Sequence, residues 1–192
     1  IEFEHYSGKH FHENAVKLNC ARNCLSYLIQ AYKIEKVYLP YFLCDSVWKT
    51  CKKYGAEFEF YHIDENFMPI VPDADFEKDW LYAVNYYGQL TNEKIMSLSK
   101  HAPNLIIDNV QAFFQLPVSH IPTLYSCRKF FGVADGAYLY ADSKLSEKFE
   151  RDISYNRMNF LLGRFEKSAQ EFYPQYAANN DLFENEPVKL MS

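Results

Sequence analysis

The stretch "KVYLPYFLCDSVWKTCKKYGAEFEFYHID", residues 36–64, places a helix-like segment between two short segments rich in apolar residues. The first, "KVYLP", predicts a strand that stops at Pro40, and the last, "EFEFYHID", predicts a strand that ends at Asp64. Between them, Asp45 is a candidate N-cap for a helix and Gly55 is a candidate stop. A strand, a helix and a second strand in succession indicate parallel strands joined by a covering helix.

The same alternation extends over much of the chain. Apolar positions at helical spacing predict a helix before this stretch, and continuously apolar segments after it predict buried strands. Such strands are typical of a parallel sheet with helices on both faces. We therefore predict an α/β fold, a three-layer α/β/α sandwich around a mostly parallel sheet. The further predicted helices cover residues 19–34 and 92–102, and the further predicted strands cover residues 80–88, 104–109 and 136–141.

The character of the sequence changes near residue 142, where charged residues become frequent and the pattern becomes helical. We predict a sheet domain over residues 1–142 and a helical segment over residues 143–192. Within that segment we interpret "YPQYAANND", residues 173–181, as a break. We expect the segment to lead away from the sheet toward a smaller C-terminal domain outside this chain.

Composition excludes several classes of protein. The 192 residues suffice for one substantial domain, and the net charge of −5 provides no basic field for nucleic acid. No apolar run approaches the roughly 18 residues that a membrane span needs. The start "IEFEHYSGKHFHEN" lacks the features of a signal peptide, so we predict a cytoplasmic protein with reduced cysteines. Neither the cysteines nor the histidines have metal-ligand spacing, and we expect no metal site and solvated side chains at His5, His10 and His12.

Candidate functional residues follow the predicted strands, because ligands bind at the carboxyl ends of strands in such sheets. A buried carboxylate at Asp108 needs a cationic partner or hydrogen-bond donors, although it could instead cap a following helix. Gln111 can turn toward the same crevice. A partly desolvated Lys129 can lose its proton and attack a carbonyl carbon, although a solvated surface turn is the alternative. Acid, amide and lysine together match the needs of pyridoxal phosphate, which are a partner for the pyridinium nitrogen and a Schiff-base lysine.

These segments, taken in order, resemble the large domain of a fold type I pyridoxal-phosphate enzyme of the DegT/DnrJ/StrS family of sugar aminotransferases. The resemblance covers about residues 18–140. "LNCARNCLSYLI" stands at the family's phosphate-cradling turn and first helix, and "IIDNVQAFF" carries its DxxQ motif. "AVNYYGQ" matches another family segment, and Lys129 precedes an acidic–glycine pair, Asp135 and Gly136, by six residues. The order and spacing of the motifs, rather than any one of them, carry the resemblance.

The resemblance implies a role for each matching residue. Lys129 would hold the cofactor as a Schiff base and later move a proton between the substrate carbon and the cofactor. Asp108 would pair with the pyridinium nitrogen, and Gln111 would bond the phenolic oxygen of the ring. The other implied cofactor-binding residues are Ala21, Arg22 and Asn23 at the phosphate turn, Cys44, Asn85, Ser126 and Asn156.

The implied activity is an aminotransferase that moves an amino group from an amino acid such as glutamate to a nucleotide-linked keto sugar, in polysaccharide or glycan biosynthesis. The segment "YNRM", with Asn156 and Arg157, resembles a loop that reaches the phosphate site of a second subunit. The resemblance therefore implies a homodimer with shared active sites, and small-molecule substrates.

The sequence departs from the family pattern in three places. In the family, an aromatic side chain usually stacks on the cofactor ring from the segment that matches Phe42 to Cys44. In this sequence Cys44 falls at that position, unless Phe42 substitutes for the aromatic residue. Ala21 and Arg22 stand where glycine and threonine are common, and the turn "SCRK" is shorter than usual. A dehydratase relative, which replaces the lysine, is disfavoured by Lys129. A catalytically inactive relative with a regulatory or scaffold role stays open as the alternative.

Overall fold

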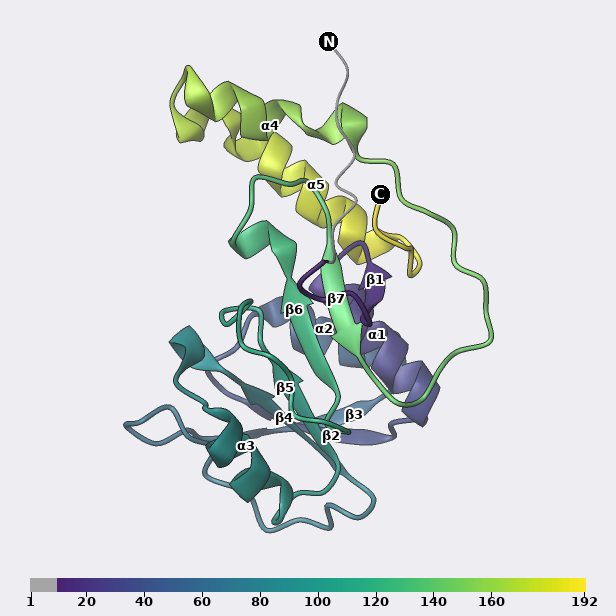
Figure 1. Cartoon of the computed structure of the whole chain (residues 1–192), viewed down its shortest axis with the longest axis vertical. Coiled ribbons are helices and arrows are strands. Elements are labelled where there is room, and N and C mark those ends of the chain that lie inside the picture. Colours follow the sequence, from purple (N-terminus) through teal and green to yellow (C-terminus); the bar gives the residue numbers. More distant parts are fainter. Residues whose placement is uncertain (1–9) are drawn as a thin grey trace.

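The computed structural model describes residues 10–192. The described part contains a seven-stranded sheet in the order β1-β7-β6-β5-β4-β2-β3 (Figure 1). Strands β2 to β6 pair in parallel, whereas β7 runs antiparallel to both of its neighbours, β6 and β1. The strands are β1 (Val16–Leu18), β2 (Lys36–Pro40), β3 (Glu57–Tyr61), β4 (Trp80–Val84), β5 (Leu105–Asp108), β6 (Thr123–Ser126) and β7 (Ala137–Tyr140).

Helices cover both faces of the sheet, as the sequence predicts. α1 (Ala21–Tyr32) and α2 (Asp45–Lys53) lie on one face, and α3 (Asn92–Ser99) lies on the other (Figure 1). Side chains alternate between the two faces of a strand, so Tyr82 of β4 packs with α1 while its neighbour Leu81 packs with α3. The predicted α/β fold with a mostly parallel sheet is confirmed.

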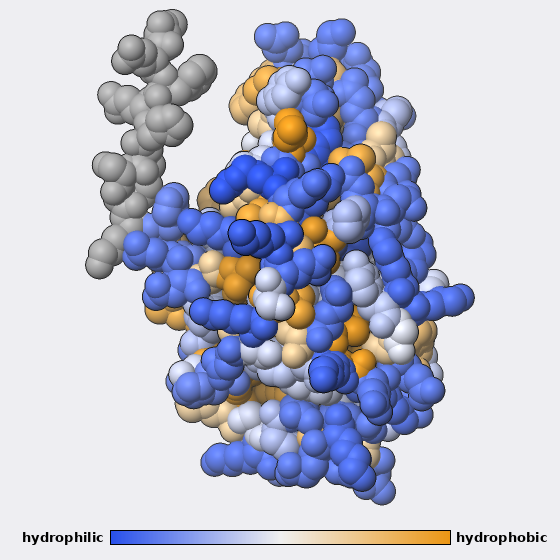
Figure 2. Space-filling view, turned by 90° about the vertical axis from the view of Figure 1, so that its right-hand side faces the viewer, coloured by the Kyte–Doolittle hydropathy of each residue, from blue (hydrophilic) through white to orange (hydrophobic). Residues whose placement is uncertain are grey.

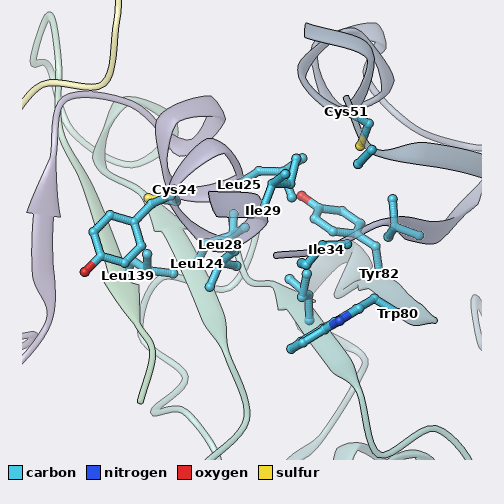
Figure 3. Close-up of a cluster of buried hydrophobic side chains, with 14 of the residues drawn as sticks. Cys24, Leu25, Leu28, Ile29, Ile34, Cys51, Trp80, Tyr82, Leu124 and Leu139 are labelled. Carbon is cyan, nitrogen blue, oxygen red and sulfur yellow. The ribbon is translucent and has the colours of Figure 1, made fainter. Parts of the chain in front are cut away.

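The main core lies between α1 and the sheet (Figure 3). Leu25, Leu28 and Ile29 recur at helical spacing on one face of α1 and are buried against Tyr82 and Leu124 of the sheet. Burial of each such side chain stabilises the fold by about 1.5–3 kcal/mol. This packing fixes the first turn of α1 beside the carboxyl ends of the central strands.

The structure of the last fifty residues differs from the prediction in two respects. The chain leaves β7, runs extended along the outside of the domain, and returns through short helices beyond the edge at which β6 ends (Figure 1). Seen from the side along which the extended part runs, the surface is mostly hydrophilic, with apolar residues gathered near its middle (Figure 2). The helices are η3 (Tyr155–Arg157), α4 (Asn159–Leu162), η4 (Gly163–Phe165), η5 (Ala169–Phe172) and α5 (Tyr173–Asn185).

The predicted course of this segment, away from the sheet, is wrong. Val188 is buried in the main core, and Leu190 forms a bridge with Leu18 of β1. Apolar residues near the end of the chain are thus buried against the sheet domain. The predicted break over residues 173–181 is also wrong, because Pro174 lies in the first turn of α5, where a missing N–H group is tolerated.

One histidine prediction needs correction as well. His12 is buried rather than solvated, with Nε2 2.9 Å from the Phe113 carbonyl oxygen and Nδ1 3.1 Å from the Tyr140 hydroxyl. Burial lowers the pKa of His12, and the bond to Phe113 opposes this only in part, so the ring is a neutral core group. His10 is exposed, and His5 lies outside the described residues.

Candidate active site

Asp108 ends β5 and forms the polar floor of a cavity at the carboxyl edge of the sheet. Its carboxylate accepts hydrogen bonds from the Tyr82 hydroxyl at 2.7 Å and from the Val110 amide at 2.9 Å. Burial raises the pKa of Asp108 above its ordinary value, while these two donors and the charge of Lys129 act in the opposite direction. The site therefore holds a carboxylate that a cation would stabilise further.

Lys129 reaches the same cavity from the turn that follows β6. The turn is a short 3-10 helix, η2 (Cys127–Lys129), and the Cys127 amide donates to the Gly136 carbonyl oxygen at 2.9 Å. A Cβ atom on Gly136 would approach Cys127 to 3.1 Å at a φ of +114°, so the close packing of this turn favours glycine there.

The amine of Lys129 acts on Asp108 through its charge but is not bonded to any group of the described residues. Among residues 10–192, no group accepts a hydrogen bond from Nζ, and no carboxylate pairs with it. The side chain is exposed, which differs from the partial desolvation that the sequence suggested, because the turn projects it toward the open side of the cavity. Lys129 is therefore free to react with a ligand that enters.

The first part of the cavity, here called the ring lobe, has a volume of about 260 Å³. Phe42, Cys44 and Gln111 line it together with Asp108 and Lys129. Gln111 accepts a hydrogen bond from the Tyr87 amide at 3.2 Å, which positions its side chain beside the opening. The structure thus brings the acid, the amide and the lysine into one cavity, as the sequence predicts.

Both candidates for the ring-stacking position lie in the ring lobe. The Phe42 ring is stacked on the Tyr86 ring, with centroids 5.4 Å apart, and the Tyr86 hydroxyl donates to the Phe42 carbonyl oxygen. Phe42 is 58% exposed, and Cys44 is exposed as the N-cap of α2. The helix starts at Asp45, so its N-cap is Cys44, one residue earlier than the predicted cap. An aromatic face is therefore available at Phe42 although Cys44 provides none.

The second part of the cavity, the arginine lobe, has a volume of about 500 Å³ and shares Asp108 and Lys129 with the ring lobe. Ala21 and Arg22 line it from the first turn of α1, and Ser126 lines it from the end of β6. No side chain caps α1 at its N-cap, and the first turn contains no acidic residue. A helix start of this kind favours an anion.

Three predicted site residues do not line either lobe. Asn85 is fully buried, and its amide bonds Leu90, Asn109 and Gln115 within the fold. Its role in this structure is to hold the turn after β4. Asn23 is likewise buried.

The amide of Asn23 donates to Asn19 Oδ1 at 2.6 Å, one turn back on the chain. Asn156 is exposed in η3 and lines none of these cavity walls. Its neighbour Arg157 forms an internal ion pair with Asp152 at 2.8 Å. Arg157 is therefore not free to contact a second subunit.

Sequence reasoning missed the wall that α4 and α5 contribute. Phe160, Tyr176 and Asn180 line the arginine lobe, as does Arg128 next to Lys129. Arg128 lies 5.7 Å from the Tyr176 ring centroid. No local pattern indicates this contact, because residues about fifty positions apart make it.

Within residues 10–192, no group of three or more histidine, cysteine or acidic side chains has an arrangement that could hold a metal ion. The same residues include no helix long and apolar enough to span a membrane.

No family model matches the sequence, and no curated protein does. Solved structures, however, match the fold. An aminotransferase from Psychrobacter cryohalolentis is 18% identical, with a TM-score of 0.55 over 67% of this chain and 38% of that one. NtdA from Bacillus subtilis, with its cofactor PMP bound, is 14% identical, with a TM-score of 0.54 over 68% of this chain and 33% of that one. The chain has the fold of these aminotransferases.

A DegT DnrJ EryC1 StrS aminotransferase from Brucella abortus matches as well, at 13% identity and a TM-score of 0.50 over 67% of this chain and 42% of that one. The expected likeness to this class of aminotransferase is confirmed at the level of the fold. The chain spans 33% to 42% of the length of these three structures.

The residues of the cavity fit pyridoxal phosphate. Asp108 is a buried carboxylate suited to a cationic ring nitrogen, Gln111 provides an amide, and Lys129 is an uncommitted amine in the same lobe. In the arginine lobe, Arg22 Nε is buried without a hydrogen-bond partner. One cavity thus offers a partner for each polar part of the cofactor.

Proposed function

We propose that the chain is the cofactor-binding part of a pyridoxal-phosphate-dependent aminotransferase. The observation that carries the proposal is the meeting of Asp108, Gln111 and Lys129 in one cavity, at the strand ends of a fold shared with aminotransferases. When bound, the cofactor supplies an electron sink and a carbonyl carbon that can carry an amino group.

Each side chain then has a task that follows from its surroundings. Asp108, held ionised by the Tyr82 hydroxyl and by a cationic ring nitrogen, keeps positive charge at that nitrogen. Gln111 orients the ring through its amide. Lys129 attaches the cofactor, and its Nζ atom later accepts a proton from the substrate carbon and returns it.

We further propose that glutamate or a similar amino acid is the amino donor and that a nucleotide-linked keto sugar is the acceptor. The support is the resemblance of the motifs to sugar aminotransferases together with the fold. The product would enter polysaccharide or glycan biosynthesis. We place the enzyme in the cytoplasm, in keeping with five free cysteines.

A second proposal concerns assembly as a homodimer with shared sites. Asn156 is exposed beside Tyr155, which is 82% exposed, so this turn is available to a second copy. Arg157 is excluded from that role by its ion pair with Asp152. Mixing an Asn156→Ala subunit with a Lys129→Ala subunit would restore one intact site per heterodimer. Verified heterodimers that show no activity would contradict shared sites.

A single-turnover measurement tests the proposed reaction. The protein is loaded with pyridoxal phosphate and mixed with glutamate, and the conversion of the cofactor to pyridoxamine phosphate is followed. We expect conversion by the wild type and a large loss in Asp108→Asn, which keeps the shape but removes the charge. A wild type that binds the cofactor but never converts it would favour the inactive relative. An Asp108→Asn variant with wild-type conversion would return Asp108 to a structural role.

A further inference from the structure

Asn180 of α5 lies between two arginines of the arginine lobe and accepts a hydrogen bond from each of them. Arg22 Nη1 donates to the Asn180 carbonyl oxygen at 3.0 Å, and Arg128 Nη2 donates to Asn180 Oδ1 at 2.8 Å. All three residues line the same lobe. One residue from the returning C-terminal segment therefore engages both guanidinium groups.

These guanidinium groups form no ion pair within the described residues, although Asp181 and Glu184 line the same lobe. Among the described residues, no carboxylate pairs with Arg22 or Arg128, and Arg22 Nε is buried with no hydrogen-bond partner at all. Burial raises the pKa of the Cys20 thiol, at the N-cap of α1, to about 11, although a backbone hydrogen bond and the charges of both arginines oppose the rise. Both charges therefore act on the uncapped start of α1.

Guanidinium groups bind phosphate with two parallel hydrogen bonds and more strongly than they bind a neutral amide. The Asn180 amide and carbonyl present two oxygens to the two arginines, as a phosphate group would, but carry no charge.

We propose that Arg22 and Arg128 form a phosphate clamp and that Asn180 is its internal stand-in, which a phosphate-bearing ligand displaces. The proposal rests on the proposed function, in that the cofactor's phosphate is the natural occupant of this end of the cavity. Without ligand, α5 closes the clamp. With ligand, the two arginines turn to the phosphate, and α5 loses their two hydrogen bonds to Asn180.

The remaining contacts keep α5 attached when the clamp opens. Asn179 accepts from Arg157 at 3.0 Å and donates to the Ala134 carbonyl oxygen at 2.9 Å, and Phe183 is buried. Displacement of Asn180 is therefore a local movement of the helix rather than its release. The apparent affinity for phosphate is reduced by the fraction of molecules in which the clamp is closed.

Two substitutions at Asn180 have opposite predicted effects on the binding of inorganic phosphate, measured by titration calorimetry. Asn180→Ala removes the Oδ1 acceptor and frees Arg128, so phosphate should bind about tenfold more tightly. Asn180→Asp places a carboxylate against Arg128, so phosphate should bind at least about tenfold more weakly. Asn185→Ala is the matched control, because Asn185 lies on the same helix and bonds only the Asp181 carbonyl oxygen. It should leave the affinity unchanged.

Hydrogen exchange on the wild-type protein gives a second readout that needs no variant. Saturating inorganic phosphate should speed exchange of the α5 amides while leaving α1 unchanged. Variants at Asn180 that bind phosphate as the wild type does, or α5 amides that exchange no faster with phosphate, would overturn the clamp. Inorganic phosphate has no carbonyl group, so a failure of Lys129 chemistry with pyridoxal phosphate leaves this test intact.

Discussion

Tyr82→Phe removes one hydroxyl and tests how Asp108 is kept ionised. The Tyr82 hydroxyl donates to Asp108 Oδ2 at 2.7 Å, and both side chains are buried. A hydrogen bond to a charged group contributes about 1.5–3 kcal/mol. Because 1.36 kcal/mol corresponds to one pKa unit, loss of this bond should raise the pKa of Asp108 by about one to two units.

The assay is the affinity for pyridoxal phosphate, measured by absorbance titration across acidic and neutral pH. Burial already raises the pKa of Asp108, and binding of a cationic ring requires the ionised carboxylate. As pH falls, the carboxylate is protonated and affinity drops. In Tyr82→Phe this drop should occur about one to two pH units higher than in the wild type.

Tyr61→Phe is the matched control for this experiment. Its hydroxyl is also buried, but it donates to the Tyr82 backbone carbonyl at 2.9 Å and does not touch Asp108. This variant should lose stability without moving the pH at which affinity drops. Coincident pH profiles for the wild type and both variants would refute the role given to Tyr82.

Two further predictions concern stability. Asp152→Asn breaks the buried ion pair with Arg157 and should lower the free energy of unfolding by roughly 3–5 kcal/mol in urea at neutral pH. Burial alone would raise the pKa of Asp152, but hydrogen bonds from Asn19 and Arg157 outweigh it and lower the pKa. The stabilisation is therefore present above the unfolded pKa, and the difference between wild type and variant should shrink as pH falls through the folded pKa; a difference independent of pH would contradict it. Phe183→Ala should cost about 3–5 kcal/mol by the same method, and a cost below about 1 kcal/mol would show that α5 is not anchored by this ring.

The sequence predicts most of the sheet and much of the site for one physical reason. Pro40 and Gly55 mark the ends of local elements, and parallel strands bring their carboxyl ends to one edge. Asp108 ends one strand and Lys129 follows another, so the fold brings them to the same edge of the sheet without any long-range contact that the sequence would have to specify. Asn85 also follows a strand, but its side chain turns into the fold, and strand position alone does not determine that direction.

The C-terminal segment could not be placed from the sequence. The bridge between Leu18 and Leu190 and the burial of Val188 join residues far apart in the chain, and three-residue strands such as β1 leave no periodic pattern. The contacts of Asn180 with Arg22 and Arg128 depend on this return of the chain. Local propensity therefore predicts the layers but not the wall that closes the arginine lobe.

The most direct test of the central claim is the identity of the lysine that carries the cofactor. The protein is incubated with pyridoxal phosphate, reduced with borohydride to fix the link between amine and carbonyl carbon, digested, and mapped by mass spectrometry. The account predicts a pyridoxyl group on Lys129 and none at that position in Lys129→Ala. Labelling of another lysine at full occupancy, with Lys129 unmodified, would contradict the assignment of Lys129 and with it the proposed active site.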